Sequence, residues 1–160
     1  MEITYILNNK KVTSSITPHT MLLNELRSQG CFSVKCGCES TSCGLCTVWL
    51  DGTPILSCTM PAARIAGHSI TTLEGLQAQA LEFTRFMAEE GSDQCGFCNP
   101  GFIMNVLAMA RELDNPDQNQ INHYLAGNLC RCTGYAGHMR AIEKYLAFRS
   151  AIQKGGADND

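Results

Sequence analysis

Cysteine is the residue that most constrains how this chain can fold. The sequence holds ten cysteines, and eight of them form two groups of four with different internal spacing. The first quartet is Cys38, Cys43, Cys46 and Cys58, and the second quartet is Cys95, Cys98, Cys130 and Cys132. The first reads C-x4-C-x2-C with a distant fourth cysteine, whereas the second is two close pairs separated by a long gap. The fold must therefore bring distant residues together at two places.

The spacing of the first quartet is the one by which plant-type ferredoxins hold a [2Fe–2S] cluster. Such a cluster needs converging thiolates, and glycines such as Gly37 and Gly44 let the backbone approach its sulfurs. Zinc is the alternative, but zinc ribbons usually carry two C-x2-C knuckles, whereas here one loop supplies three ligands. The first quartet therefore favours an iron–sulfur cluster.

The spacing of the second quartet is compatible with zinc, a [2Fe–2S] cluster or a redox-active thiol pair. Cys95-Gly96-Phe97-Cys98 looks like a thioredoxin-type C-x-x-C motif, although that motif normally belongs to a βαβ unit and the surroundings here read as helical. Two alternatives to an electron carrier thus stay open from spacing alone. They are a thiol–disulfide oxidoreductase and a zinc-stabilised interaction module.

Composition and charge narrow the class of protein. A hydrophobic share of 44% and a charged share of 17% are ordinary for a globular chain with a buried core. The net charge of −3 gives no basic footprint for nucleic acid, and no apolar run approaches the roughly 18 residues of a membrane span. The N-terminus shows no export signal, so we expect a cytoplasmic protein, in which dense cysteine argues for metal ligation or redox chemistry.

Residue patterns predict two different halves. Strands are expected at residues 3–7, 12–17, 47–50, 54–56 and 70–73, with one helix at 21–28 that Thr20 caps and Gly30 ends. Helices are expected at residues 77–90, 100–113, 119–126 and 137–152, with Asn99 and Pro100 as N-cap and N1 of the second. The prediction is an α+β unit over residues 1–76, a four-helix bundle over 77–154 and a disordered tail at 155–160.

Four segments closely resemble the small iron–sulfur subunit of the molybdenum hydroxylases, the xanthine dehydrogenase and aldehyde oxidoreductase family. They are residues 33–38, 43–48, 94–101 and 127–135, and the last, Gly-Asn-Leu-Cys-Arg-Cys-Thr-Gly-Tyr, is highly specific. The resemblance spans roughly residues 3–148. It implies an α+β chain in which an N-terminal β-grasp, ferredoxin-like domain precedes an all-α four-helix bundle, each domain binding one [2Fe–2S] cluster.

The resemblance also implies roles for particular residues. Each quartet supplies the four ligands of one cluster, and Gln94 and Cys132 match positions that contact the pterin of a molybdenum cofactor on a large partner subunit. The first cluster faces FAD on a medium subunit, or another acceptor, in a heterotrimer that can dimerise. The chain is then an electron-transfer subunit with no catalytic residue. The partner would choose among purine, aldehyde, N-heterocycle and aromatic acyl-thioester substrates, with xanthine or a related purine as the default.

Some residues depart from the family pattern or lie outside it. Thr41 stands where the family usually has glycine, Leu45 replaces a common alanine and Asn99 a common threonine. These changes are expected to alter the potential of a cluster rather than its ligands. Cys31 and Cys36 are surplus, and we expect them to be small buried or partly exposed residues. Cys36 lies two residues from Cys38, so an exchange of ligand after damage is an alternative role for it. The four histidines, His19, His68, His123 and His138, are expected to be surface or capping residues.

Overall fold

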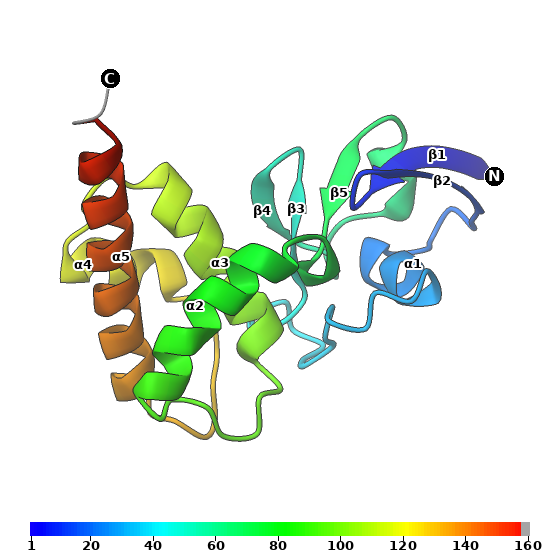
Figure 1. Cartoon of the computed structure of the whole chain (residues 1–160). Coiled ribbons are helices and arrows are strands. Elements are labelled where there is room, and N and C mark those ends of the chain that lie inside the picture. The colour runs from blue at the N-terminus through cyan, green and yellow to red at the C-terminus, as the bar shows by residue number, and fades with distance from the viewer. Residues whose placement is uncertain (158–160) are drawn as a thin grey trace.

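The computed structural model describes the backbone of residues 1–157 and the side chains of residues 1–152. The strands are β1 (Glu2–Leu7), β2 (Lys10–Ser15), β3 (Thr47–Leu50), β4 (Thr53–Leu56) and β5 (Ser69–Thr71). The α-helices are α1 (Leu22–Ser28), α2 (Gln77–Glu89), α3 (Asn99–Glu112), α4 (Gln118–Leu125) and α5 (Ala136–Ala157), with short 3₁₀ helices at η1 (Ala62–Ile65) and η2 (Leu73–Gly75). The strands and α1 lie at one end of the molecule and α2 to α5 at the other (Figure 1).

The strands form one mixed sheet in the order β2-β1-β5-β3-β4. β1 pairs in parallel with β5, and the other neighbours are antiparallel. Asn8 and Asn9 have φ of 49° and 66°, and Asp51 and Gly52 have φ of 48° and 86°. Positive φ at both central residues is what a two-residue type I′ hairpin requires. The predicted strands on either side of these turns therefore form two hairpins, with strand ends shifted by at most two residues.

Helix α1 packs against the sheet through an apolar face. Leu22 and Leu26 are completely buried and share a core with residues of β1, β3 and β5. The predicted Thr20 cap is wrong. Met21 occupies the N-cap position without a side-chain hydrogen bond, and the Thr20 hydroxyl accepts from the Thr17 N–H at 3.1 Å instead. Gly30 follows the helix with φ +86°, as expected for a residue that ends it.

The second half is helical, and its four helices enclose a separate apolar core. Phe83 and Met87 of α2, and Ile142 and Tyr145 of α5, are completely buried in it. The predicted N-cap of α3 is wrong by one residue, because Cys98 holds that position and Asn99 is already helical. An Asn side chain competes for local hydrogen bonds, and this one donates to the carboxylate of Asp93 rather than capping the helix.

The C-terminal boundary also differs from the expectation. Helix α5 continues through 155–157, which were expected to be disordered, and residues 158–160 lie outside the described part of the chain. No helix within residues 1–157 combines the length and apolar character needed to cross a membrane.

Trp49 joins the two halves. It lies on β3, yet its ring is only 8% exposed and belongs to the apolar core of the helical half. Its indole N–H donates to the carbonyl of Met104 on α3 at 3.0 Å. The guanidinium of Arg111 lies 4.5 Å from the centre of the same ring and donates to the carbonyl of Gly52 in the β3–β4 turn. The sheet and α3 are thus bound by apolar, cation–π and hydrogen-bonding contacts.

Candidate metal centres

The first quartet gathers around the loop between α1 and β3. Cys38, Cys43 and Cys46 lie on this loop, and Cys58 follows β4. The thiols of Cys43 and Cys38 are within hydrogen-bonding reach of each other, and so are those of Cys58 and Cys46. The Cys58 thiol is also close enough to interact electrostatically with Cys38 and Cys43. Four sulfurs that span twenty residues of sequence therefore form one group, as the spacing predicted.

The thiols of this group differ sharply in acidity. Hydrogen bonds from the Cys43 thiol and from the amides of Cys43, Ser40 and Ser42 lower the pKa of Cys38 to about 6. Burial raises the pKa of Cys43, and burial together with the neighbouring sulfur of Cys46 raises the pKa of Cys58 to about 12. One sulfur thus sits in a nest of N–H donors, which is what a thiolate or a cluster sulfur needs.

The second quartet closes a gap of more than thirty residues. Cys98 occupies the N-cap position of α3 without a capping side-chain bond, and Cys95 precedes it. Cys130 and Cys132 lie on the loop between α4 and α5. The sulfurs of Cys132 and Cys95 are 3.5 Å apart. The thiols of Cys98 and Cys130 are likewise within hydrogen-bonding reach of each other. Each sulfur of one pair therefore meets a sulfur of the other.

The acidities in the second quartet repeat the pattern of the first. Burial raises the pKa of Cys130, but hydrogen bonds from the Thr133 hydroxyl and the amides of Cys132 and Thr133 outweigh it and lower the pKa. Burial and the Cys130 sulfur raise the pKa of Cys98 to about 12. The hydrogen bond to Cys95, and its charge, raise the pKa of Cys132.

These acidities bear on what the quartets can bind. Crowded thiols raise one another's pKa, so four thiolates can coexist at neutral pH only beside a positive centre such as iron. Within residues 1–152, no three His, Cys, Asp or Glu side chains are arranged to hold a single metal ion. A [2Fe–2S] group differs from a single ion because its four cysteine ligands are distributed over two irons. The donor set of each quartet fits that group.

The two quartets share a cleft, because their loops touch. A cavity of about 360 Å³ is lined by Cys38, Cys43 and all four cysteines of the second quartet. The Leu129 N–H donates to the carbonyl of Cys43 at 2.9 Å. Gly44 has φ +72°, and a Cβ there would overlap the carbonyl of Gly127. Only glycine combines this conformation with such a close backbone approach, so Gly44 allows the loops to meet.

The rim of the second quartet is exposed and partly apolar. Gln94, which the sequence singled out together with Cys132, is exposed, as are Cys132 and Cys95. The aromatic and aliphatic side chains around them are also exposed: Phe97 at 48%, Leu129 at 39% and Tyr135 at 36%. Apolar side chains around accessible thiols are typical of a surface that another protein covers.

One residue near the quartets differs clearly from the sequence-based expectations. His138 was expected at the surface or in a cap, but it is 1% exposed and its ring lies edge-on to Phe102. Cys31 is buried, which agrees with the expectation, whereas Cys36 is exposed. The spacing of His138 after Cys132 could have been noticed, but its burial depends on tertiary packing.

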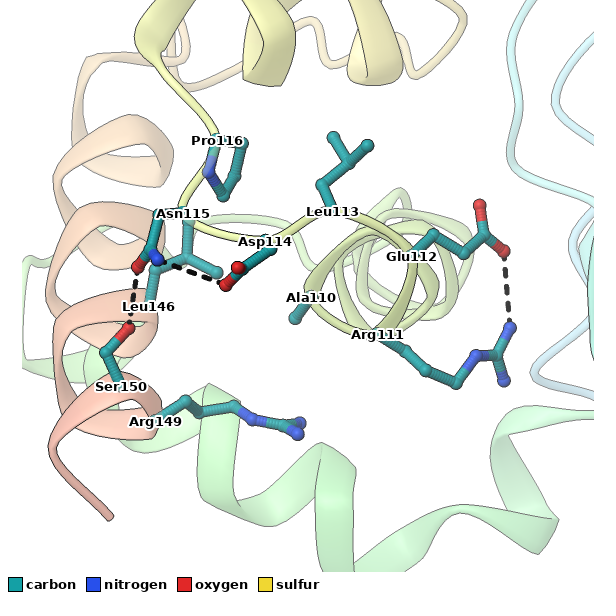
Figure 2. A pocket seen from close by; sticks show the side chains of 10 residues that line it. All are labelled: Ala110, Arg111, Glu112, Leu113, Asp114, Asn115, Pro116, Leu146, Arg149 and Ser150. Carbon is teal, nitrogen blue, oxygen red and sulfur yellow. Dashed lines mark hydrogen bonds and ion pairs between the residues drawn. The ribbon is translucent and has the colours of Figure 1, made fainter. Parts of the chain in front are cut away.

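A further cavity contains no cysteine. It measures about 240 Å³ and lies where the α3–α4 connection meets α5 (Figure 2). There Asn115 accepts a hydrogen bond from Ser150 at 3.1 Å and donates to Asp114 at 3.0 Å, which ties the connection to α5. Arg149, which also lines this cavity, lies over the ring of Tyr145. These contacts give Asn115, Ser150 and Arg149 a structural role in holding the α3–α4 connection and α5.

Comparison with known proteins connects this geometry to a family. A family profile described as "[2Fe-2S] binding domain" matches residues 72–143. The chain is 48% identical over 123 residues to the xanthine dehydrogenase iron-sulfur-binding subunit of Escherichia coli O157:H7, covering 74% of this chain and 77% of that protein. It is 37% identical over 158 residues to the nicotinate dehydrogenase small FeS subunit of Eubacterium barkeri. That match covers 96% of this chain and 97% of that protein.

A solved structure shows the same arrangement. A chain of quinoline 2-oxidoreductase from Pseudomonas putida 86 superposes with a TM-score of 0.86 at 32% identity, over 95% of this chain and 96% of that one. The similarity therefore extends over both the sheet and the helices.

Proposed function

We propose that this chain, which belongs to the small iron–sulfur subunits of the molybdenum hydroxylases and transfers electrons in them, binds two [2Fe–2S] clusters. Cys38, Cys43, Cys46 and Cys58 hold the first, and Cys95, Cys98, Cys130 and Cys132 hold the second. The observation that carries the proposal is the gathering of eight cysteines into two groups of sulfurs, each drawn from distant segments.

The chain's own residues prepare the two sites. When bound, a [2Fe–2S] group takes up and gives back single electrons. The amides around Cys38 and Cys130 donate to sulfur and stabilise negative charge there. Cys98 lies at the N-terminus of α3, where the helix dipole also favours an anion. The contact of Cys43 with Leu129 fixes the two loops relative to each other.

The exposed rim of the second quartet is the proposed contact with a molybdenum-binding partner. Gln94 and Cys132 would face the pterin on a large subunit, and Phe97, Leu129 and Tyr135 would be covered by that subunit. A medium subunit carrying FAD would receive electrons from the first cluster. The names of the relatives as subunits support an assembly of several chains. We propose that this assembly is a heterotrimer that can dimerise and that its substrate binds on the large partner.

The proposed domain boundary remains at residues 76 and 77. Each side of it has its own apolar core, although Trp49 of the sheet and Leu76, the last residue before the boundary, are buried in the helical core. A ferredoxin-like domain at 1–76 and a helical domain at 77–154 would thus each hold one cluster.

Iron analysis and spectroscopy of variants test the proposal. The anaerobically reconstituted chain should contain about four iron atoms and show two distinguishable paramagnetic signals when reduced. Cys130→Ala should halve the iron content and abolish one signal, because it removes a ligand of one cluster. Cys36→Ala is the matched control, since Cys36 is exposed and outside both quartets, and it should keep both signals.

Other outcomes would support the alternatives. A colourless chain that binds zinc under the same conditions would favour the zinc-stabilised module. An iron-free chain that reduces disulfides through Cys95 and Cys98 would favour the thiol–disulfide oxidoreductase. Retention of both signals in Cys130→Ala would mean that the second quartet is wrongly assigned.

A further inference from the structure

His138 on α5 is a buried polar residue that the proposed function does not use. It is 1% exposed, and within the described part of the chain its Nε2 atom has no hydrogen-bond partner. Phe102 packs edge-on against the ring, with the ring centres 4.6 Å apart. His138 also borders a narrow space beneath Cys98 and Cys130 that has no room for a water molecule. An apolar side chain would fill this place without leaving a polar atom unpaired.

The other ring nitrogen points to the second quartet. His138 Nδ1 lies 3.0 Å from the Thr133 hydroxyl oxygen. The same hydroxyl lies 3.2 Å from the sulfur of Cys130 and accepts a hydrogen bond from the Tyr135 N–H, also at 3.2 Å. Thr133 therefore connects the buried imidazole to a proposed cluster ligand.

The direction of these hydrogen bonds follows from the number of protons available. A hydroxyl has one hydrogen to donate and two lone pairs to accept with. A cluster-bound Cys130 sulfur is a thiolate and can only accept, and a backbone N–H can only donate. Thr133 must then donate to Cys130 and accept from both Tyr135 and His138. This order requires the His138 proton on Nδ1.

The position of Nε2 agrees with this order. With the proton on Nδ1, a neutral ring leaves only a lone pair at Nε2, and that is the atom without a partner. Burial lowers the pKa of His138, which favours the neutral ring. The loop around Thr133 is fixed by Tyr135, which has φ +68°. The Tyr135 hydroxyl accepts a hydrogen bond from the Cys130 N–H at 2.8 Å, so Tyr135 contacts both Thr133 and the residue that carries the sulfur.

We infer that His138 and Thr133 are positioning residues that set the potential of the second cluster, through a hydrogen-bond chain from Nδ1 to the Thr133 hydroxyl to the Cys130 sulfur. The inference rests on the proposed function, since it needs a cluster in the second quartet. A hydrogen bond to a ligand sulfur stabilises the more negative, reduced form of a cluster and so raises its reduction potential. The imidazole keeps the hydroxyl pointed at sulfur and polarises it.

Redox titration of the full reconstituted chain, followed by its two paramagnetic signals, tests this chain of bonds. Thr133→Val should shift the second cluster's one-electron equilibrium about tenfold toward the oxidised form, a fall of about 59 mV. His138→Phe keeps a ring but removes the donor, and it should shift the equilibrium in the same direction by about threefold. Thr133→Ser and His138→Asn retain a hydroxyl and a donor near Nδ1, and they should restore most of the potential.

The first cluster is the internal control, and its potential should not change in any variant. Unchanged potentials in Thr133→Val and His138→Phe, with full iron and both signals, would overturn the inference while leaving the proposed function intact. A shift in Thr133→Val without one in His138→Phe would overturn the role of the histidine. If Thr133→Val fails to fold, His138→Phe and His138→Asn still decide between the outcomes. An unaltered chain without iron would instead contradict the proposed function.

Discussion

Thr41 has a left-handed backbone conformation that glycine adopts more easily than threonine. It has φ +59°, a left-handed conformation in which a β-branched side chain is strained. The sequence resemblance implies a glycine at this position in the family, and glycine adopts a positive φ without this strain. Thr41 lies in the loop between Cys38 and Cys43, so the strain is stored in the backbone that carries the first quartet.

Replacing Thr41 by glycine should stabilise the chain. Thr41→Gly relieves a conformation that costs about 1–2 kcal/mol, and the added freedom of the unfolded chain returns about 0.5–1 kcal/mol of that gain. We expect a net increase of about 1 kcal/mol in the free energy of unfolding of the iron-loaded chain. Urea denaturation followed by far-UV circular dichroism measures it.

The matched control is Glu39→Gly in the same exposed loop. Glu39 does not have a positive φ, so glycine there should only add freedom to the unfolded chain and cost about 0.5–1 kcal/mol. Equal effects of the two substitutions would show that the strain at Thr41 does not contribute to stability.

For single residues, the sequence shows which cysteines group together better than it shows which residues pack around them. Cysteine spacing indicated which sulfurs gather in the first quartet, and the family resemblance indicated the second, whose spacing alone was also compatible with zinc or a redox thiol pair. The burial of His138 and its link to Thr133 could not be predicted in the same way. A lone histidine on a helical pattern looks alike whether it faces solvent or a core, and only packing against Phe102 decides between them.

The N-terminus of α3 is the element that brings the two quartets together. Gly101 lies in its first turn, and a Cβ there would come within 2.5 Å of the Gly44 carbonyl oxygen and 2.8 Å of the Leu45 Cα. These are backbone atoms, which cannot move aside as a flexible side chain could. Helix α3 therefore packs directly against the loop of the first quartet, while Cys98 at its N-cap belongs to the second.

Gly101→Ala should separate these elements. Overpacking of this kind costs about 1–3 kcal/mol, even though alanine favours a helix. We expect a lower urea midpoint and a faster loss of the visible absorption of the clusters. Gly127→Ala is the control, because the corresponding Cβ meets no atom within 4 Å, and it should leave both quantities nearly unchanged. A Gly101→Ala chain as stable as the unaltered one would refute direct packing of α3 on the loop.

The presence of each helix and strand was predictable from the periodicity of apolar residues, whereas the residue at which each helix starts was not. The apolar spacing identified each α-helix and strand, but the caps at Thr20 and Asn99 were misplaced. Polar side chains near a helix start can bond locally or cap the helix, and the two outcomes differ by small energies. The capping box of Asp117 and Gln120 at α4 shows the opposite case, in which side-chain pairing at the expected spacing does define the start.

The interface between the two halves decides how the whole molecule behaves. Trp49 is the only tryptophan in the sequence, and the helical core buries it although it belongs to the sheet. The hydrogen bonds from Trp49 to Met104 and from Leu129 to Cys43 cross the same boundary. No local pattern around Trp49 predicts these contacts, because they depend on how two separately patterned halves dock. Their number favours halves that associate even when the chain between them is cut.

Two fragments, 1–76 and 77–160, test this association. Fragment 1–76 should bind about two iron atoms in the first quartet, and its Trp49 fluorescence should lie at longer wavelength than in the whole chain because the ring meets water. Adding fragment 77–160 should move the emission back to shorter wavelength as the ring is buried. A helical fragment carrying Gly101→Ala should dock more weakly, since its α3 cannot approach Gly44.

The emission of fragment 1–76 is the decisive quantity. If it already equals that of the whole chain while the fragment retains its iron, the sheet half buries Trp49 by itself and the docking contact is not needed. If the emission changes on mixing but Gly101→Ala has no effect, the halves associate without a contribution from close packing of the α3 N-terminus. Only a change on mixing that the substitution weakens supports an interface built by both Trp49 and the α3 N-terminus. Because that N-terminus also carries Cys98, the same contact would hold the two quartets at a fixed separation.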